Sequence, residues 1–250
     1  VELIEVPNRY LAGVAEVKLK EKFSDKTNWR KMLTSKIDEV DIINNKIDYN
    51  GTGNWTINTS LSYGVSIPTI YSAVSTRLLS IHFLKKNKPN KKPSSSFEIE
   101  ENHIHDLILF CFSCAMFQGL SILSQANEKE KLRINLEEVL KTWTAGCILQ
   151  GKFLDLFSSE FSKSKKLGYQ FLHNFISNNT KGDLMKIRKL LSFSNENQSP
   201  TPVISSSLNY YDSIFSTHKI GEITQLQRNY FGKHKLKNKN GKKLINPNWN

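Results

Sequence analysis

Cysteine is scarce in this chain of 250 residues, which has only Cys111, Cys114 and Cys147. An odd number of cysteines in apolar surroundings is not the pattern of a secreted domain held by disulfides, so a reducing compartment is expected. Residues 1–10 lack the basic start, apolar stretch and cleavage site of a signal peptide. No apolar run approaches the ~20 residues that a membrane span needs. The sequence therefore predicts a cytoplasmic protein with no membrane partner.

Motifs of self-contained catalytic or metal sites are also missing. The six histidines include no pair spaced for one metal on a helix face, and no Gly-x-Ser-x-Gly turn offers a nucleophile. Cys111 and Cys114 have the spacing of a zinc or redox pair, with His103, His105 and Cys147 as candidate further ligands. The pair lies inside an apolar run rather than at a helix start, where a thiolate would be stabilised. We interpret both as core cysteines and expect no metal site.

Sustained alternation of apolar and polar residues is absent, and no strand-helix-strand succession occurs, so the predicted fold class is all-α. Helical spacing, with Ser66 as a cap and Pro68 in the first turn, predicts a helix that ends before Lys85. Further helices are predicted over 98–126, from Asn135 through the small residues 145–147, and over 165–177, 183–195 and 204–215. These segments predict an N-terminal helical part (1–49), a helical domain (50–232) with a flexible linker at 86–96, and an extended basic tail (233–250).

Positive charge is in excess, with a formal net charge of +12, which favours anionic partners. Much of it is Lys mixed with Asn in residues 85–92 and 233–243, which we interpret as solvated loops. The segment 225–234 differs, because it places Arg228 and His234 beside aromatic residues. A guanidinium and an imidazole can together bind a phosphate or carboxylate, although the end of a surface amphipathic helix has the same composition.

A glycine-rich segment, Gly51-Thr52-Gly53, begins like a dinucleotide-binding fingerprint. Thr56 stands where the third glycine would be, and no strand precedes the segment. We therefore interpret it as a tight turn that lets the backbone approach a ligand or a helix.

Gln225-x-Gln227-Arg228-x-Tyr230-Phe231-Gly232-x-His234 resembles the carboxyl-terminal signature of the 6-phosphogluconate dehydrogenases. Other segments resemble the same family in the same order over residues 50–250: Gly51 to Thr56 with Gly64, Val65 and Pro68, then Ala73, Val74 and Arg77, then Trp143 with Ala145 to Ile148, then Pro200, Pro202 and Leu208 to Asp212, and finally Asn248 and Trp249. The resemblance implies the helical-bundle C-terminal domain of that family.

The resemblance implies a cytosolic homodimer that uses NADP to oxidise 6-phosphogluconate and releases carbon dioxide to give ribulose 5-phosphate, a step of the pentose phosphate pathway. By position, it implies that Arg77 holds the substrate phosphate. It also implies that Arg228 and His234 reach across the dimer into the other subunit's pocket. Two guanidinium forks and an imidazole suit a dianionic phosphate better than mobile lysines would.

Several positions depart from the family pattern. Asn50 and Asn54 stand where the family has substrate-site lysines. Thr144, Gln150 and Phe215 stand where it has arginines. Losing one charge-assisted hydrogen bond to a phosphate costs about 1.5–3 kcal/mol, so weaker substrate affinity is expected unless Asn50 compensates.

The family's nucleotide-binding fold, general-base lysine and general-acid glutamate belong to sequence before residue 1. We therefore expect neither catalytic residues nor an NADP site in these 250 residues, and no activity without a separate nucleotide-binding domain or chain. One alternative is a non-catalytic helical module that binds polyanions through its lysines, although nucleic acid is the less expected partner. Another is a structural partner subunit that keeps the fold while its ligand contacts decay.

Overall fold

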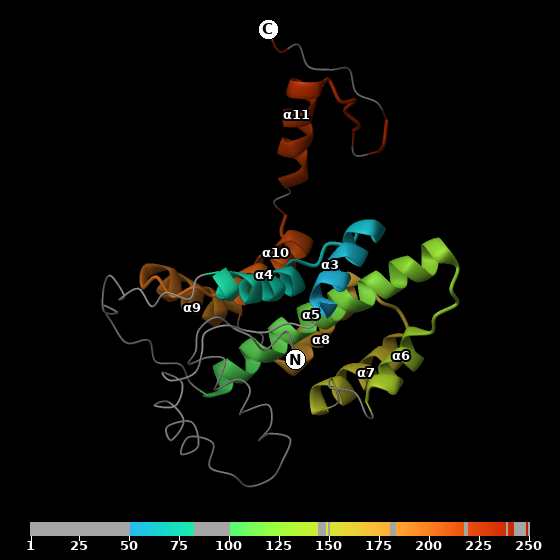
Figure 1. The fold of residues 1–250 in the computed structure, drawn as a ribbon, viewed down its shortest axis with the longest axis vertical. Coiled ribbons are helices and arrows are strands. Elements are labelled where there is room, and N and C mark those ends of the chain that lie inside the picture. Colours follow the sequence, from blue (N-terminus) through green and yellow to red (C-terminus); the bar gives the residue numbers. More distant parts are fainter. Residues whose placement is uncertain are drawn as a thin grey trace. The chain divides into compact units, whose positions relative to one another are not determined.

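Helices are the only regular elements in the part of the chain that the structure describes (Figure 1). The computed structural model describes residues 51–82, 101–144, 149, 151–180, 184–217, 220–238, 240–242 and 249. The helices are α3 (Thr52–Tyr63), α4 (Pro68–His82), α5 (Glu101–Glu130), α6 (Leu136–Trp143), α7 (Lys152–Ser164), α8 (Tyr169–Asn179), α9 (Leu184–Glu196), α10 (Pro202–Phe215) and α11 (Ile220–Gly232). The all-α prediction is confirmed.

The chain divides into two compact units, Val1–Tyr210 and Tyr211–Asn250. The predicted N-terminal helical part, 1–49, and the predicted linker, 86–96, lie outside the described residues. The predicted helices that correspond to α4, α5, α8, α9 and α10 are confirmed, with ends that differ by a few residues.

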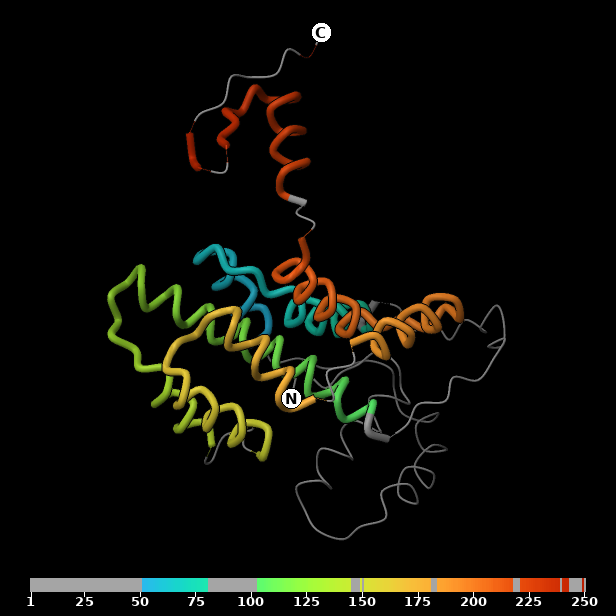
Figure 2. Tube along the Cα trace, turned by 180° about the vertical axis from the view of Figure 1, so that it is seen from behind, coloured from blue at the N-terminus to red at the C-terminus, as the bar shows by residue number. Residues whose placement is uncertain are grey.

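α5 forms the centre of the first unit, with α3 and α4 on one side and α8 on the other, as the front and rear views together show (Figures 1 and 2). It is the one described helix that is long and apolar enough to cross a membrane, since an 18-residue window has mean hydropathy 1.9. The expectation that no apolar run approaches this length was therefore wrong. Because 72% of the window is buried inside the protein, α5 packs as a core helix.

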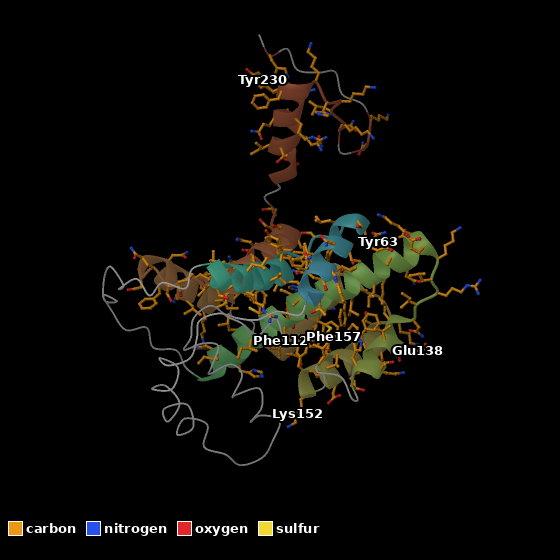
Figure 3. All side chains as sticks on the ribbon, viewed as in Figure 1. Tyr63, Phe112, Glu138, Lys152, Phe157 and Tyr230 are labelled. Carbon is orange, nitrogen blue, oxygen red and sulfur yellow. The ribbon has the colours of Figure 1, made fainter. Side chains whose placement is uncertain are left out.

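Phenylalanine rings join α5, α7 and α8. The ring of Phe153 lies 5.4 Å from that of Phe112 and 5.8 Å from that of Phe157. Phe157 is fully buried and lies 4.8 Å from Phe175 on α8. Phe112 and Phe157 are labelled in Figure 3. Such aromatic pairs add to the stabilisation from apolar burial, so this cluster helps to hold α7 against α5 and α8.

Helices α3 and α7 were not predicted. Each follows a glycine, Gly51 or Gly151, without a side-chain cap, so the usual signal for a helix start is missing. α7 nevertheless buries Leu154, Phe157 and Phe161 at helical spacing, which is a signal that the sequence does contain.

The predicted start of α6 is confirmed, whereas its predicted length was wrong. Asn135 is the N-cap, and its side chain accepts a hydrogen bond from the Glu137 backbone N–H at 3.0 Å. The helix ends at Trp143, with Thr144 as its C-cap. The small residues 145–147, which were expected within the helix at a close crossing, lie outside the described residues.

A buried amide ties the start of α4 to α5. The Gln118 Oε1 accepts hydrogen bonds from the backbone N–H groups of Thr69 at 3.1 Å and Ile70 at 3.4 Å. Its Nε2 donates to the Thr69 hydroxyl at 2.9 Å, and that hydroxyl shares a hydrogen bond with Ser207 of α10 at 3.1 Å. The first N–H groups of a helix have no acceptor within the helix, so Gln118 has the capping role that was predicted for Ser66.

Cys111 and Cys114 are free and buried, which confirms the interpretation as core cysteines. Burial raises the pKa of the Cys111 thiol to about 12. Burial, followed by the neighbouring Cys111, raises the pKa of Cys114 well above its ordinary value. Metal binding and nucleophilic attack need the thiolate, which this environment disfavours. Cys147, a candidate further ligand, lies outside the described residues.

Replacing Gln118 with Leu keeps the approximate shape of the side chain but leaves the Thr69 and Ile70 N–H groups without an acceptor. Each buried donor left unpaired costs about 1–3 kcal/mol, so we expect the free energy of unfolding to fall by about 2–4 kcal/mol in urea denaturation. Gln170→Leu, on the exposed side of α8, is the matched control and should change stability by less than about 0.5 kcal/mol. Equal stability of the two variants would contradict the capping role.

The Cys111 thiol predicts an alkaline loss of stability. Its folded pKa of about 12 lies above its ordinary value of 9.0, so the folded chain holds this proton more tightly than the unfolded chain. The stability that the neutral thiol provides is complete below about pH 9 and declines as the pH rises towards 12. In Cys111→Ser, whose hydroxyl does not titrate, the unfolding free energy should decline less steeply over that range. Parallel profiles for the variant and the wild type would refute this.

Candidate functional site

Arg77 is carried by α4, whose start Gln118 fixes. It lies one turn after Ala73 and Val74, which are buried, and it is itself partly buried. Its aliphatic stem therefore continues the buried side of the helix. The Ser80 hydroxyl donates to the Arg77 carbonyl oxygen at 2.6 Å. The guanidinium thus projects from a rigid element rather than from a loop.

A cavity of about 370 Å³ lies between α4 and the start of α10. Its lining includes Tyr71, Ser75, Leu79 and Thr201, and no charged side chain contributes to it. Arg77 is not part of this lining. A dianionic phosphate needs charged donors, so this cavity does not suit one.

Arg228 and His234 belong to the second unit. Arg228 is exposed on α11, and His234 is exposed just after the helix ends at Gly232. Lys233 turns the chain there with a left-handed φ of 51°, and its N–H donates to the Asn229 carbonyl oxygen at 2.8 Å. This turn directs the chain back along the end of α11.

The imidazole of His234 occupies space that only a glycine at position 232 leaves open. A Cβ on Gly232 would lie 2.8 Å from the imidazole Cδ2 and 2.9 Å from its Nε2. Both distances are shorter than a normal contact between non-bonded heavy atoms. The glycine of the Tyr-Phe-Gly-x-His segment therefore gives the imidazole its place against the backbone.

Asn229 joins this turn to the end of the chain, and it is only 2% exposed on an otherwise exposed helix. Its Nδ2 donates to the His234 carbonyl oxygen at 2.7 Å, and its Oδ1 accepts from the Trp249 indole N–H at 2.8 Å. The Trp249 ring meets the Tyr230 ring edge-on, with centroids 5.4 Å apart. Figure 3 labels Tyr230 on α11. Nothing in the sequence distinguishes Asn229 from the chain's many other asparagines, so this role could not be predicted.

The predicted site residues fall in different parts of the chain. Arg77 lies in the first unit, Arg228 and His234 lie together in the second, and Asn50 lies outside the described residues. Within the second unit, Asn229 links the two predicted residues, since it follows Arg228 directly and bonds to His234.

Where they are described, the departures from the family pattern lie at various positions. Asn54 is exposed on α3, Thr144 ends α6, and Gln150 lies outside the described residues. Phe215 packs its ring 4.5 Å from that of Tyr211.

The glycine-rich segment forms a turn and a helix rather than a cofactor loop. Gly51 has a left-handed φ of 84°, α3 begins at Thr52, and Gly53 is buried within that helix. The left-handed conformation agrees with the predicted turn at Gly51, whereas the predicted close approach to a helix is not seen there, since no described atom beyond its chain neighbours lies within 4 Å of the place of a Cβ on Gly51. A strand-turn-helix that could hold the pyrophosphate of NADP is absent from the described residues, so these residues do not fit that cofactor.

The sequence profile of the family described as "6-phosphogluconate dehydrogenase, C-terminal domain" matches residues 9–249. The chain is 31% identical over 204 residues to the decarboxylating 6-phosphogluconate dehydrogenase of Synechocystis sp.. The matched region covers 78% of this chain and 42% of the relative. The enzyme of the same name from Lactococcus lactis subsp. cremoris is 29% identical over 217 residues, with coverage of 82% and 46%.

The fold is similar to that of Plasmodium falciparum 6-phosphogluconate dehydrogenase, with a TM-score of 0.73 and 27% sequence identity. The similarity covers 84% of this chain and 47% of the Plasmodium falciparum chain. That protein was solved in its apo form, with NADP⁺ and with 6-phosphogluconate. The chain spans less than half the length of these relatives. All the described helices fall within the matched residues 9–249. The chain therefore belongs to the 6-phosphogluconate dehydrogenase family and corresponds to its C-terminal domain.

Proposed function

We propose that this chain is the substrate-binding and dimerisation part of an NADP-dependent 6-phosphogluconate dehydrogenase, which converts 6-phosphogluconate to ribulose 5-phosphate and carbon dioxide. The observation that carries the proposal is the presence of Arg77, Arg228 and His234 at their motif positions within a family match over residues 9–249. The division into 1–49, 50–232 and 233–250, and a cytoplasmic location, belong to the same proposal.

NADP and the proton-transfer groups belong, in this proposal, to a nucleotide-binding part of the same protein or of a partner. The described residues support this assignment, because their one glycine-rich turn, at Gly51, opens the short helix α3. The chain therefore binds and orients the substrate but does not oxidise it by itself.

The phosphate of 6-phosphogluconate is the group that Arg77, Arg228 and His234 bind in this proposal. Guanidinium groups form paired, charge-assisted hydrogen bonds with phosphate oxygens. Arg228 and His234 are exposed, so they are accessible to a ligand. Asn50 and Asn54 replace two family lysines, so the affinity is lower than the full charge set would give.

A homodimer supplies the cover that exposed apolar residues in each unit require. On α11, Ile223 and Leu226 are 70% and 43% exposed and lie on one side of the helix. In the first unit, Trp55 and Leu61 of α3 are 67% and 74% exposed. Apolar surface of this kind marks protein interfaces. A second copy that receives α11 and the tail would complete the pocket of each subunit.

Removal of either arginine should weaken binding of 6-phosphogluconate to the 250-residue chain. Each charge-assisted contact is worth about 1.5–3 kcal/mol, so Arg77→Ala and Arg228→Ala should each raise the Kd roughly 10- to 100-fold in isothermal titration calorimetry. Lys237→Ala, an exposed cation of the second unit, is the control and should bind like the wild type. Non-saturable binding that falls steeply with salt and responds equally to all three substitutions would instead favour the polyanion-binding module.

The chain should be a dimer at micromolar concentration in sedimentation velocity. Leu226→Asp places a charge on the exposed apolar side of α11 and should shift the population towards monomer. Gln225→Asp introduces the same charge at the neighbouring position and should leave the dimer intact. A monomeric wild type would argue against the dimerisation role.

A further inference from the structure

We propose that Asn229 and Trp249 are positioning residues, which hold the His234 imidazole in place for binding the substrate anion. The inference rests on the proposed function, because it assigns the geometry of the same binding residues. Its consequence is that the end of the chain controls the shape of the site.

The two partners of the Asn229 side chain are of opposite kinds. The indole N–H of Trp249 can only donate, and the carbonyl oxygen of His234 can only accept. A single orientation of the amide satisfies both, with Oδ1 towards Trp249 and Nδ2 towards His234. A carboxylate could accept from Trp249, but it would repel the His234 carbonyl oxygen. An apolar side chain would serve neither partner.

Trp249 holds the second end of the amide. Its indole N–H lies 2.8 Å from Oδ1, and its ring is held edge-on against Tyr230 at an interplanar angle of 80°. Without the indole N–H, the amide would be held only through its hydrogen bond to the His234 carbonyl oxygen, and Oδ1 would lose this donor. The amide, and the turn that it holds, would then be less firmly placed.

The positions of the His234 backbone and of its imidazole depend on different residues. Asn229 holds the carbonyl oxygen at 2.7 Å, and the absence of a side chain at Gly232 lets the imidazole lie against the helix end. Lys233, which has a left-handed φ of 51°, forms the turn between Gly232 and His234. Asn229 also follows Arg228 directly, so one residue ties together the backbone of both anion-binding side chains.

The exposure of these residues separates this arrangement from ordinary core packing. The imidazole of His234 is exposed, and Trp249 remains 45% exposed. Asn229 is the one buried residue of the described part of α11. A buried two-ended hydrogen bond that supports an exposed imidazole contributes to orientation rather than to a large core.

The test compares three variants of the full chain by calorimetric titration with 6-phosphogluconate. Asn229→Leu removes both hydrogen bonds at similar volume, Trp249→Phe removes the indole N–H but keeps an aromatic ring, and Gly232→Ala places a methyl group where the imidazole lies. Each variant loses either a hydrogen bond of Asn229 or the place of the imidazole, so its Kd for 6-phosphogluconate should rise roughly 3- to 10-fold. Asn174→Leu, exposed on α8, is the matched control and should bind like the wild type.

Nuclear magnetic resonance supplies a readout that a structural role alone would not change. In the wild type, 6-phosphogluconate should shift the His234 imidazole signals, assigned by His234→Gln, and the Trp249 indole proton should exchange slowly. Gly232→Ala should keep the slow indole exchange and the unfolding midpoint of the wild type, yet lose the ligand-induced imidazole shift. Wild-type affinity and imidazole shifts in all three variants would overturn the positioning role.

Failure of the proposed function would look different. If the wild type did not bind 6-phosphogluconate, or Arg228→Ala bound it equally well, the assignment of the ligand would fall, and the positioning role with it. Loss of binding in Arg228→Ala together with wild-type binding in the three variants would remove only the positioning role.

Discussion

The arrangement of the first unit depends on hydrogen bonds to the backbone N–H groups at one buried helix start. α4 begins inside the core, where water cannot serve the N–H groups of its first turn, and burial of unpaired donors is costly. Gln118 is 0% exposed and accepts from two of these groups while it donates to the Thr69 hydroxyl. The same hydroxyl reaches Ser207, so three helices meet at one amide. Arg77 lies on α4 roughly two turns further on, so the cap also helps to hold the backbone that carries it.

The second unit also contains a buried amide, but few other residues are buried around it. Asn229 and Leu236 are its buried residues from α11 onwards in the described part of the chain, and an apolar side of α11 stays exposed. Both units thus use an amide with its two ends engaged, at places where a carboxylate of the same shape would fail. The difference is that Gln118 lies in a closed core, whereas Asn229 lies on a helix whose apolar side is exposed.

Local patterns predicted the long helices, because their apolar residues recur at helical spacing and their ends carry recognisable caps. α7 was missed because Gly151 gives it no capping side chain, although its buried phenylalanines follow the helical period. The two amides could not have been found in this way. Gln118 and Thr69 are separated by 49 positions, and Asn229 and Trp249 by 20, so neither pair leaves a local signature. Arg77, Arg228 and His234 were predicted as site residues through resemblance to a family rather than through spacing or composition.

Some positions have lost the charged residue of the family and others have kept it. Comparing the two groups bears on whether the chain binds a ligand or serves only as structural support. Where Phe215 replaces a family arginine, its ring packs 4.5 Å from that of Tyr211. Arg228 and His234 are exposed, and burial explains neither. Gly232 leaves space for an exposed imidazole, and Asn229 holds the backbone turn that carries it, with little apolar burial in return. A subunit that served only as structural support would not need this constraint, because loss of the imidazole would leave the helix and its apolar contacts unchanged. The geometry of the second unit is therefore more consistent with the proposed anion-binding role than with support alone.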